Sequence, residues 1–321
     1  MDIVCLGEIL IDFFPAEYGR RLVDVSAFIP RPGGAPANVA VAARRLGSQA
    51  AFIGKVGQDA FGHLLAQTLA AEGVDIHSLT FAPATRTTLA FIAKPDAATS
   101  EYVFYRNPGA DLKLSILDLD FDMLHTCRAL HIGSLSLGDE PARAATHAAV
   151  QMAHSGGGLV SFDVNYRPSL WPSAHKALEQ IRTMLPRVDL VKVNEDEALL
   201  LTGSSDPQIA GPALLQSGPT LAILTQGARG SYFFTRGVTG YLPSFQVQAV
   251  DATGCGDSFI AGLLNRLTRQ PDWRSQLNQS HLTLAFRFAS AVGALTATRP
   301  GAIPAMPGLE EVENFLASHP A

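Results

Sequence analysis

Charged residues are scarce in this sequence, and neither sign dominates. Of the 321 residues only 17% are Asp, Glu, Lys or Arg, and 24 basic against 29 acidic side chains give a net charge of -5. A protein that covers nucleic acid over a broad surface needs an excess of Lys and Arg to neutralise phosphates. The composition therefore argues against such a protein, although it leaves room for a local basic patch.

Cysteine is also rare. Cys5, Cys127 and Cys255 lie far apart, are odd in number and form no CxxC pair. This usage excludes a disulfide framework and is typical of a reducing cytoplasm. Nine histidines occur without an HExxH motif or a close His/Cys cluster, so the sequence gives no sign of a zinc site.

Long apolar runs are missing as well. The best candidate, near residues 283–297, is interrupted by Arg287, and a membrane-spanning helix needs about 20 apolar residues. The N-terminal segment MDIVCLGEILIDFFP contains acidic residues and no basic start, so it is read as a buried strand and not as a signal peptide. We expect a soluble, cytoplasmic protein with no membrane partner.

What the sequence has is a large apolar fraction, 47%, arranged in alternating strand-like and helix-like segments. Such alternation predicts an α/β fold, a mostly parallel sheet with helices on both faces. The expected strands are 2–10, 50–54, 159–164, 189–194, 221–226 and 231–235. The expected helices are 36–47, 59–73, 139–154, 174–184, 195–202, 207–217, 257–268, 281–297 and 308–318.

Two segments interrupt this alternation. Residues 13–32 show no helical period, and residues from about 86 to 108 resemble two strands joined by a KPDAAT turn. We expect them to form a small β-sheet lid over the edge of the main sheet. With no internal repeat or linker, the whole chain, 1–321, is predicted to be one domain.

The first segment with chemical potential is Gly33-Gly34-Ala-Pro-Ala-Asn38. Adjacent glycines let the backbone approach a ligand closely, and free N–H groups at a helix start suit polar groups. Asn38 offers a donor and an acceptor to sugar hydroxyls. A flexible helix entry with a satisfied Asn explains the segment about equally well.

The second is Asp251-Ala-Thr253-Gly254-Cys255-Gly256-Asp257, a glycine-rich turn that opens a helix. The backbone amides converge where the helix dipole favours anions. Asp257 is either a helix cap or a base that deprotonates an alcohol attacking a phosphate. Phe259 stands where a dinucleotide-binding fingerprint has its third glycine, which argues against a dehydrogenase. Neither a P-loop nor a GxSxG motif occurs, so a kinase with this sequence would have to bind its phosphates on this turn.

Residues 33–62 and 251–262 are similar to the two signatures of the PfkB, or ribokinase-like, carbohydrate kinases, in the same order and at about the same spacing. The resemblance runs from Gly7 to the C-terminal PGAIPAMP. It implies a three-layer α/β sandwich with a β-sheet lid. It also implies magnesium- and ATP-dependent phosphorylation of a hydroxymethyl group on a sugar or nucleoside.

The resemblance also implies roles for individual residues. Asp257 corresponds to the catalytic base, and the amides of Gly254, Cys255 and Gly256 to the anion hole. The implied sugar-binding residues are Asp12, Gly33, Gly34, Asn38, Tyr105, Arg106, Asn165 and Arg167. The implied nucleotide-binding residues are Asn194, Thr225, Gly227, Gly230, Gly254, Gly256 and Ser290, the last replacing an Asn of several relatives.

Two cation sites follow from the same resemblance. Glu197, in the Asn194-x-x-Glu197 element, is implied to organise Mg²⁺ indirectly. Asp251 and Thr253, with the loop 297–302, correspond to a monovalent-cation site that would take K⁺. The thiol of Cys255, which replaces the commoner Ala, is read as structural.

The sugar is left open between two kinds of kinase. The segments FYRNPGADL (104–112) and FDVNYRPSLWPS (162–173) look most like fructokinases, with 2-keto-3-deoxygluconate kinases as the nearest alternative. Arg106 and Arg167 could clamp a carboxylate, or contact phosphate and neutral hydroxyls. For Arg167 a purely structural ion pair within its loop is the alternative explanation. A catalytically silent sugar-binding protein is the remoter alternative, and the family makes a homodimer through the lid conceivable.

Overall fold

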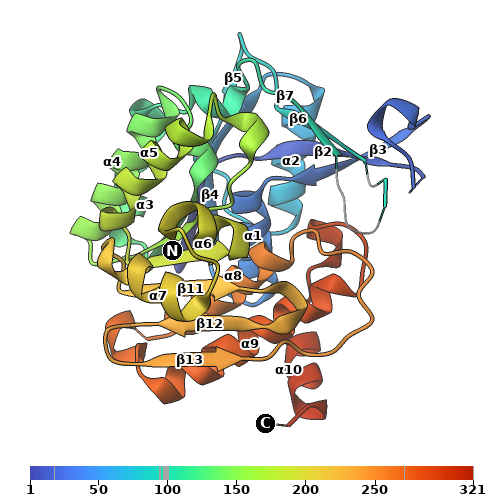
Figure 1. The fold of residues 1–321 in the computed structure, drawn as a ribbon. Coiled ribbons are helices and arrows are strands. Elements are labelled where there is room, and N and C mark those ends of the chain that lie inside the picture. The colour runs from blue at the N-terminus through green and yellow to red at the C-terminus, as the bar shows by residue number, and fades with distance from the viewer. Residues whose placement is uncertain (18, 94, 97–100, 271, 321) are drawn as a thin grey trace.

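A nine-stranded sheet forms the centre of the molecule, which we describe from a computed structural model for residues 1–17, 19–93, 95–96, 101–270 and 272–320 (Figure 1). Its strand order is β13-β12-β11-β10-β9-β8-β1-β4-β5. All neighbours pair in parallel except β11 with β12 and β12 with β13. The strands are β1 (Ile3–Leu6), β4 (Ala50–Gly57), β5 (Leu79–Ala82), β8 (Ala129–Gly133), β9 (Leu159–Asp163), β10 (Leu190–Asn194), β11 (Leu221–Thr225), β12 (Ser231–Phe234) and β13 (Thr239–Leu242).

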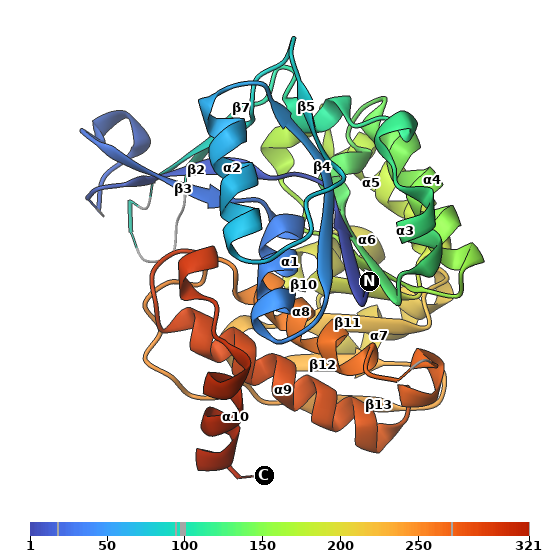
Figure 2. The ribbon, with the colours of Figure 1, turned by 180° about the vertical axis from the view of Figure 1, so that it is seen from behind.

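Helices cover both faces of this sheet. One face carries α1 (Ala35–Arg45), α2 (Ala60–Ala71), α8 (Cys255–Leu267), α9 (Gln279–Ala297) and α10 (Leu309–Ser318) (Figure 2). The other carries α3 (Phe121–Thr126), α4 (Ala142–Ser155), α5 (Ala174–Met184), α6 (Glu195–Thr202) and α7 (Pro207–Gln216). The predicted α/β sandwich is confirmed.

Strand β1 shows why the sequence of a central strand is apolar throughout. Ile3 and Cys5 pack into the hydrophobic cluster on one face, whereas Val4 and Leu6 pack into the cluster on the other. Because successive side chains of a strand point to opposite faces, a strand buried on both sides needs no polar position.

A second, four-stranded sheet extends from the main body (Figures 1 and 2). Its order is β3-β2-β6-β7, from β2 (Leu10–Pro15), β3 (Phe28–Gly33), β6 (Leu89–Ala93) and β7 (Glu101–Tyr105). These strands come from the two segments predicted to form a lid. Of the KPDAAT turn at 94–99, only Pro95 and Asp96 lie within the described residues. Whether the two sheets count as one domain stays a prediction.

The structure differs from the sequence prediction at several elements. The segment 2–10, expected as one strand, is divided at Gly7, whose φ of +151° and contact with the Pro36 ring leave no room for a Cβ. The chain there passes from the large sheet into the small one. Four elements were not predicted, namely β5, β8, β13 and α3. Strand β8, with its sequence ALHIG, contains a buried histidine, His131, whose ring lies 3.0 Å from the Ser161 hydroxyl.

Candidate active site

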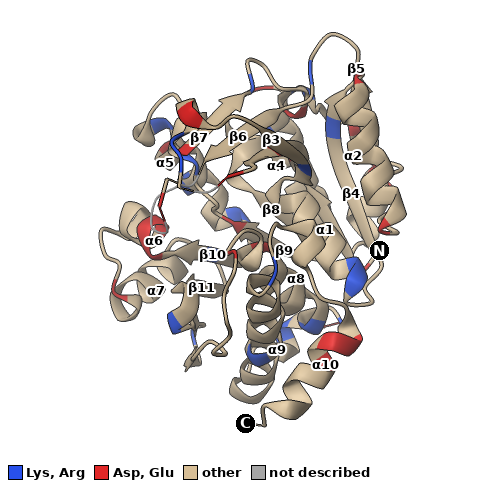
Figure 3. Ribbon diagram, turned by 90° about the vertical axis from the view of Figure 1, so that its right-hand side faces the viewer, with Lys and Arg blue, Asp and Glu red and all other residues tan. Residues whose placement is uncertain are grey.

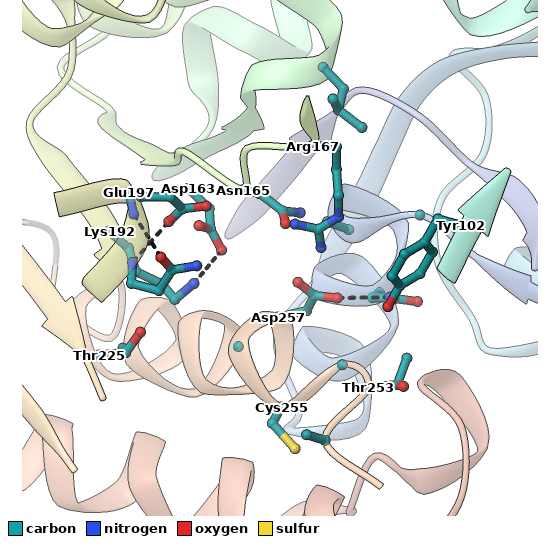
Figure 4. Close-up of a pocket in the computed structure, with 18 of the residues that line it drawn as sticks. Tyr102, Asp163, Asn165, Arg167, Lys192, Glu197, Thr225, Thr253, Cys255 and Asp257 are labelled. Carbon is teal, nitrogen blue, oxygen red and sulfur yellow. Dashed lines mark hydrogen bonds and ion pairs between the residues drawn. The ribbon is translucent and has the colours of Figure 1, made fainter. Parts of the chain in front are cut away.

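A cavity of about 660 Å³ lies where the carboxyl ends of β9, β10 and β11 meet the start of α8 and the small sheet (Figure 4). Ligands of open parallel sheets bind outside the carboxyl ends of the strands. The cavity is lined by these residues of the predicted site: Asp12, Gly34, Asn38, Asn165, Arg167, Asn194, Glu197, Thr225, Gly227, Asp251, Thr253, Gly254, Cys255, Gly256 and Asp257.

The glycine turn before α8 forms one wall. Gly254 adopts φ +79° as the residue that precedes the helix, and a Cβ there would approach Ala302 to 3.0 Å. The N–H groups of a first helical turn have no partner within the helix and can bind an anion. In this structure the Cys255 amide donates to the Ala252 carbonyl at 3.3 Å. Burial raises the pKa of the Cys255 thiol to about 12, so it is not a thiolate near neutral pH.

Asp257 occupies the first turn of α8 and faces the cavity (Figure 4). Its Oδ2 accepts a hydrogen bond of 2.8 Å from Asn38 Nδ2. Burial raises its pKa to about 6, and the Asn38 hydrogen bond opposes that rise. This carboxylate is therefore more basic than an ordinary Asp yet mostly ionised at neutral pH, which suits a general base.

Lys192 and Asp163 form a buried ion pair that the sequence analysis did not identify. Lys192 Nζ lies 2.7 Å from Asp163 Oδ2, and the two side chains are 9% and 3% exposed. Burial lowers the pKa of Lys192, but the carboxylates of Asp163, Glu197 and Asp257 together outweigh it, so the net direction is upward and the ammonium stays charged. A Cβ added to Gly256 would lie 3.2 Å from Lys192 Nζ, which places this cation against the glycine turn. A Lys within the apolar strand LVKVN was the available sequence signal.

The sugar-facing end combines hydrogen-bonding groups from several elements. Asn165 adopts the left-handed conformation, with φ +40°, in the loop after β9. Arg167 donates to the Tyr166 carbonyl at 3.2 Å and, among the described residues, forms no ion pair, so the loop ion pair considered from sequence is not found. Burial raises the pKa of Asp12 to about 7, and Arg167 opposes that rise.

Glu8 also lines this end and was not predicted. It is 4% exposed, and its Oε1 accepts from the Ala35 amide at 3.2 Å. Its Oε2 has no hydrogen-bond partner within the part of the chain that the structure describes, and the same holds for Asn38 Oδ1. Two buried acceptors without partners suit the hydroxyl groups of a ligand.

Arg106 and Tyr105 do not line the cavity, contrary to expectation. Arg106 donates to Asp111 and to the Leu135 carbonyl, and its side chain is only 5% exposed. Tyr105 is exposed, whereas Tyr102 and Phe104 of the same strand line the cavity. Because alternate residues of a strand face opposite sides, the prediction chose the wrong side of β7.

Three further predicted residues lie behind the cavity wall. A Cβ on Gly33 would lie 2.1 Å from Asp12 Oδ2, and a Cβ on Gly230 would meet the Leu242 carbonyl at 2.1 Å. Both glycines therefore permit close packing instead of lining the cavity. Ser290 is buried in α9 and does not reach the cavity.

Asn194 and Glu197 form a capping box at the start of α6. The Glu197 amide donates to Asn194 Oδ1, and Glu197 Oε2 accepts from the Asn194 amide, each at 2.9 Å. Glu197 Oε1 accepts from the Tyr166 amide at 2.7 Å. With both oxygens bound to backbone amides, Glu197 fits an indirect role toward a metal. Within the described ranges no three His, Cys, Asp or Glu side chains form a metal-ligand group.

Asp251 ties the turn before α8 to the loop after α9. Its Oδ1 accepts from the amide and hydroxyl of Thr253, and its Oδ2 from the Gly301 amide at 2.9 Å. The Ala297 carbonyl accepts from the amides of Val250 and Asp251. This oxygen-rich junction matches the chemistry of an alkali-metal site.

Known proteins resemble the chain over nearly its full length. A family model described as "pfkB family carbohydrate kinase" matches residues 1–308. "Probable fructokinase-4" of Arabidopsis thaliana is 42% identical over 317 residues, which cover 98% of this chain and 96% of that protein.

Solved structures agree. A fructokinase of Xylella fastidiosa with bound ATP has a TM-score of 0.88 and 33% identity, covering 99% of this chain and 98% of that one. A fructokinase double mutant of Vibrio cholerae O395, described as bound to fructose, ADP and potassium ion, has a TM-score of 0.89 and 32% identity, covering 98% of each chain. No helix in the described part of the chain is long and apolar enough to span a membrane.

Proposed function

Because the chain belongs to the pfkB family of carbohydrate kinases, we propose that it transfers the terminal phosphoryl group of ATP to the 6-hydroxymethyl group of D-fructose. The observation that supports this most is the position of Asp257. Its carboxylate, held by Asn38, lies in the cavity at the turn of a helix whose first amides suit phosphate.

In the reaction, Asp257 accepts the proton of the sugar hydroxyl while the hydroxyl oxygen forms a bond to the γ-phosphorus. The bond from phosphorus to the bridging oxygen of ADP breaks, and ADP leaves with that electron pair. The amides of the glycine turn and the Lys192 ammonium stabilise the negative charge on the transferred group. Closure of the small sheet, which carries Asp12, Tyr102 and Phe104, excludes water as a competing acceptor.

The two cations implied by the family resemblance, Mg²⁺ and K⁺, would each lie at a different part of the site. Mg²⁺, which neutralises phosphate charge, would lie on the α6 side of the cavity, where Glu197 fixes the backbone of Asn194 and Tyr166. K⁺ would lie at the junction of Asp251, Thr253 and the loop 297–302, where it would order the glycine turn. Both assignments rest on donor chemistry.

The burial of Arg106 favours a neutral sugar over a sugar acid. A carboxylate clamp needs guanidinium groups free to form charge-assisted pairs. Arg106 pairs with Asp111, so of these two arginines only Arg167 lines the cavity. The carboxyl groups of Glu8, Asp12 and Asp257 line it as well. 2-Keto-3-deoxygluconate would place a further negative charge among these groups, and fructose would not.

A silent sugar-binding protein would not need a base with a raised pKa beside a phosphate-binding turn. We therefore retain that function only as the remoter alternative. A homodimer through the small sheet remains proposed as well, because Ile29, Val103 and Tyr105 expose apolar surface there. A cytoplasmic location stays a prediction.

A coupled ADP-release assay with fructose, 2-keto-3-deoxygluconate, ribose and adenosine tests the function. We expect the specificity constant for fructose to exceed the others at least tenfold, with Asp257→Asn as the inactive control. A preference for the sugar acid would overturn the choice of sugar. Absence of ADP release with every sugar would favour the silent binding protein.

A further inference from the structure

A second cavity, of about 450 Å³, lies away from the active site at the opposite end of α8. It is lined by the last turn of α8, by Arg269, Gln270 and Gln276, by the first half of α9 and by Leu316 of α10. Figures 2 and 3 show these helices packed together on one face of the large sheet. The two cavities share no lining residue.

The lining of this second cavity is basic, although the chain as a whole carries a net charge of -5. Arg266, Arg269, Arg287 and His281 line it, and no Asp or Glu is among its described lining residues. Arg266 and Arg269 form no hydrogen bond or ion pair with the residues that the structure describes. Arg287 differs from these two arginines, because it donates a hydrogen bond to the His319 carbonyl.

Arg266 is held in place by an aromatic ring. Its guanidinium carbon lies 3.5 Å from the centroid of the Phe288 ring, and that ring is buried. Burial and the neighbouring Arg269 lower the pKa of Arg266 to about 10, whereas Glu313 opposes that change. The positive charge at this position is therefore only partly compensated by the protein.

Apolar surface completes the cavity. Leu284 is 64% exposed on α9 at its rim, and Leu316 of α10 lines it as well. A ligand that fits both the charge and the apolar surface has an anionic end and an apolar or aromatic portion. The volume lies in the range of small-molecule sites, about 300–1,000 Å³.

We propose that this cavity is a second ligand site, which binds a phosphorylated small molecule bearing an aromatic or apolar portion. The phosphate pairs with the guanidiniums of Arg266 and Arg269, which suit phosphate geometry. The apolar portion packs against Leu284 and Leu316. A purely structural role for the two arginines, as complements to the C-terminal dipole of α8, predicts no such binding.

The probe for the experiment is radiolabelled ADP, which has a diphosphate and a planar base. Equilibrium dialysis in the presence of saturating fructose counts ADP sites per chain. We expect two sites in the unmodified protein and one in the double variant Arg266→Gln/Arg269→Gln. A matched double variant at exposed arginines elsewhere, Arg20→Gln/Arg236→Gln, should retain both sites.

The kcat of the Arg266→Gln/Arg269→Gln variant for fructose shows whether that variant has lost only the second site or has failed to fold. Neither arginine lines the active site, so the double variant should keep its kcat for fructose within about twofold. Should that variant fail to fold, Leu284→Glu serves instead, because the residue is exposed and the new carboxylate would repel the phosphate. It should also lose one site.

One ADP site in the unmodified protein would overturn the proposal, as would loss of the second site in the Arg20 and Arg236 control. Sedimentation at increasing protein concentration tests whether a second copy of the chain, and not a small molecule, occupies the cavity. Self-association that disappears in Leu284→Glu would show that another copy of the chain fills the cavity, and would overturn the small-molecule assignment.

Discussion

Asn38 Nδ2 lies 2.8 Å from Asp257 Oδ2, so the first turns of α1 and α8 are joined by one hydrogen bond across 219 positions of sequence. Each of the two helices is preceded by a glycine with positive φ, Gly34 at +106° before α1 and Gly254 at +79° before α8. The bond orients the carboxylate and leaves Asn38 Oδ1 without a partner among the described residues. One side chain can thus position the base and contact the sugar.

Asp257→Ala should lower kcat for fructose by about 10²–10⁴-fold, the usual effect of losing a general base. The dissociation constant for fructose should change by no more than a few-fold, as measured by calorimetry. Near-normal turnover would instead make Asp257 a helix cap.

Gly254→Val should raise KM for ATP and lower kcat, with less effect on fructose binding. A branched side chain at φ +79° would strain the turn and meet Ala302. Gly157→Val is the matched control, because Gly157 has φ +82° and open space around it. Equal kinetic effects of both changes would contradict a phosphate-binding role for the Gly254 turn.

Arg106→Ala should destabilise the protein more than it weakens sugar binding. Removing one partner of a buried ion pair leaves the Asp111 carboxylate uncompensated and costs about 3–5 kcal/mol. Urea unfolding would measure the loss, and Arg106→Met/Asp111→Leu should recover part of it. A tenfold weaker fructose affinity with unchanged stability would indicate direct contact with the sugar.

The pH dependence of kcat/KM should follow the protonation of Asp257. With a pKa of about 6 in the free enzyme, the base is protonated as the pH falls below 6, so kcat/KM for fructose should fall there. Asn38→Ala removes a hydrogen bond that lowers this pKa, and should therefore move the acid limb to higher pH. A limb unchanged or moved to lower pH would contradict the assignment.

Stability should depend on pH in the opposite direction to activity. Burial raises the pKa of Glu8 and Asp12 to about 7, so between about pH 4 and 7 the folded protein holds protons that the unfolded chain has released. The free energy of unfolding should therefore fall as pH rises through this window, and level off above it. Asp12→Asn should flatten that slope in urea titrations at several pH values.

The sequence predicted the elements with strong local signals and missed those without them. Helices with glycine ends, such as the one that stops before Gly47, were placed within a few residues. Strand β8 was missed because its five residues carry no turn signal of their own and acquire strand structure from pairing with β1 and β9. Arg106 shows a second limit, since the pairing of a charged side chain with Asp111 is decided by packing that a motif does not encode.

For the active site, the sequence analysis identified the glycine turns and the acidic residues within the two signatures. It did not identify Glu8, Asp163 and Lys192 as site residues. All three lie in or beside apolar segments, where a single charged residue has no pattern around it. A rule that every charge within a buried strand needs a partner would have singled out Lys192 and Asp163. It would not have shown that they partner each other.

The division of the site between two sheets has a consequence for how such an enzyme changes. Asp12, Tyr102 and Phe104 belong to the small sheet, whereas Lys192 belongs to β10 of the large sheet, and the glycine turn and Asp257 lie at the start of α8, which packs on that large sheet. Substitutions on β2 and β7 can therefore alter which acceptor is taken without disturbing the phosphoryl-transfer machinery. Selectivity and chemistry become separately adjustable, and a laboratory library confined to the inward positions of these two strands is the economical route to a kinase for a different sugar.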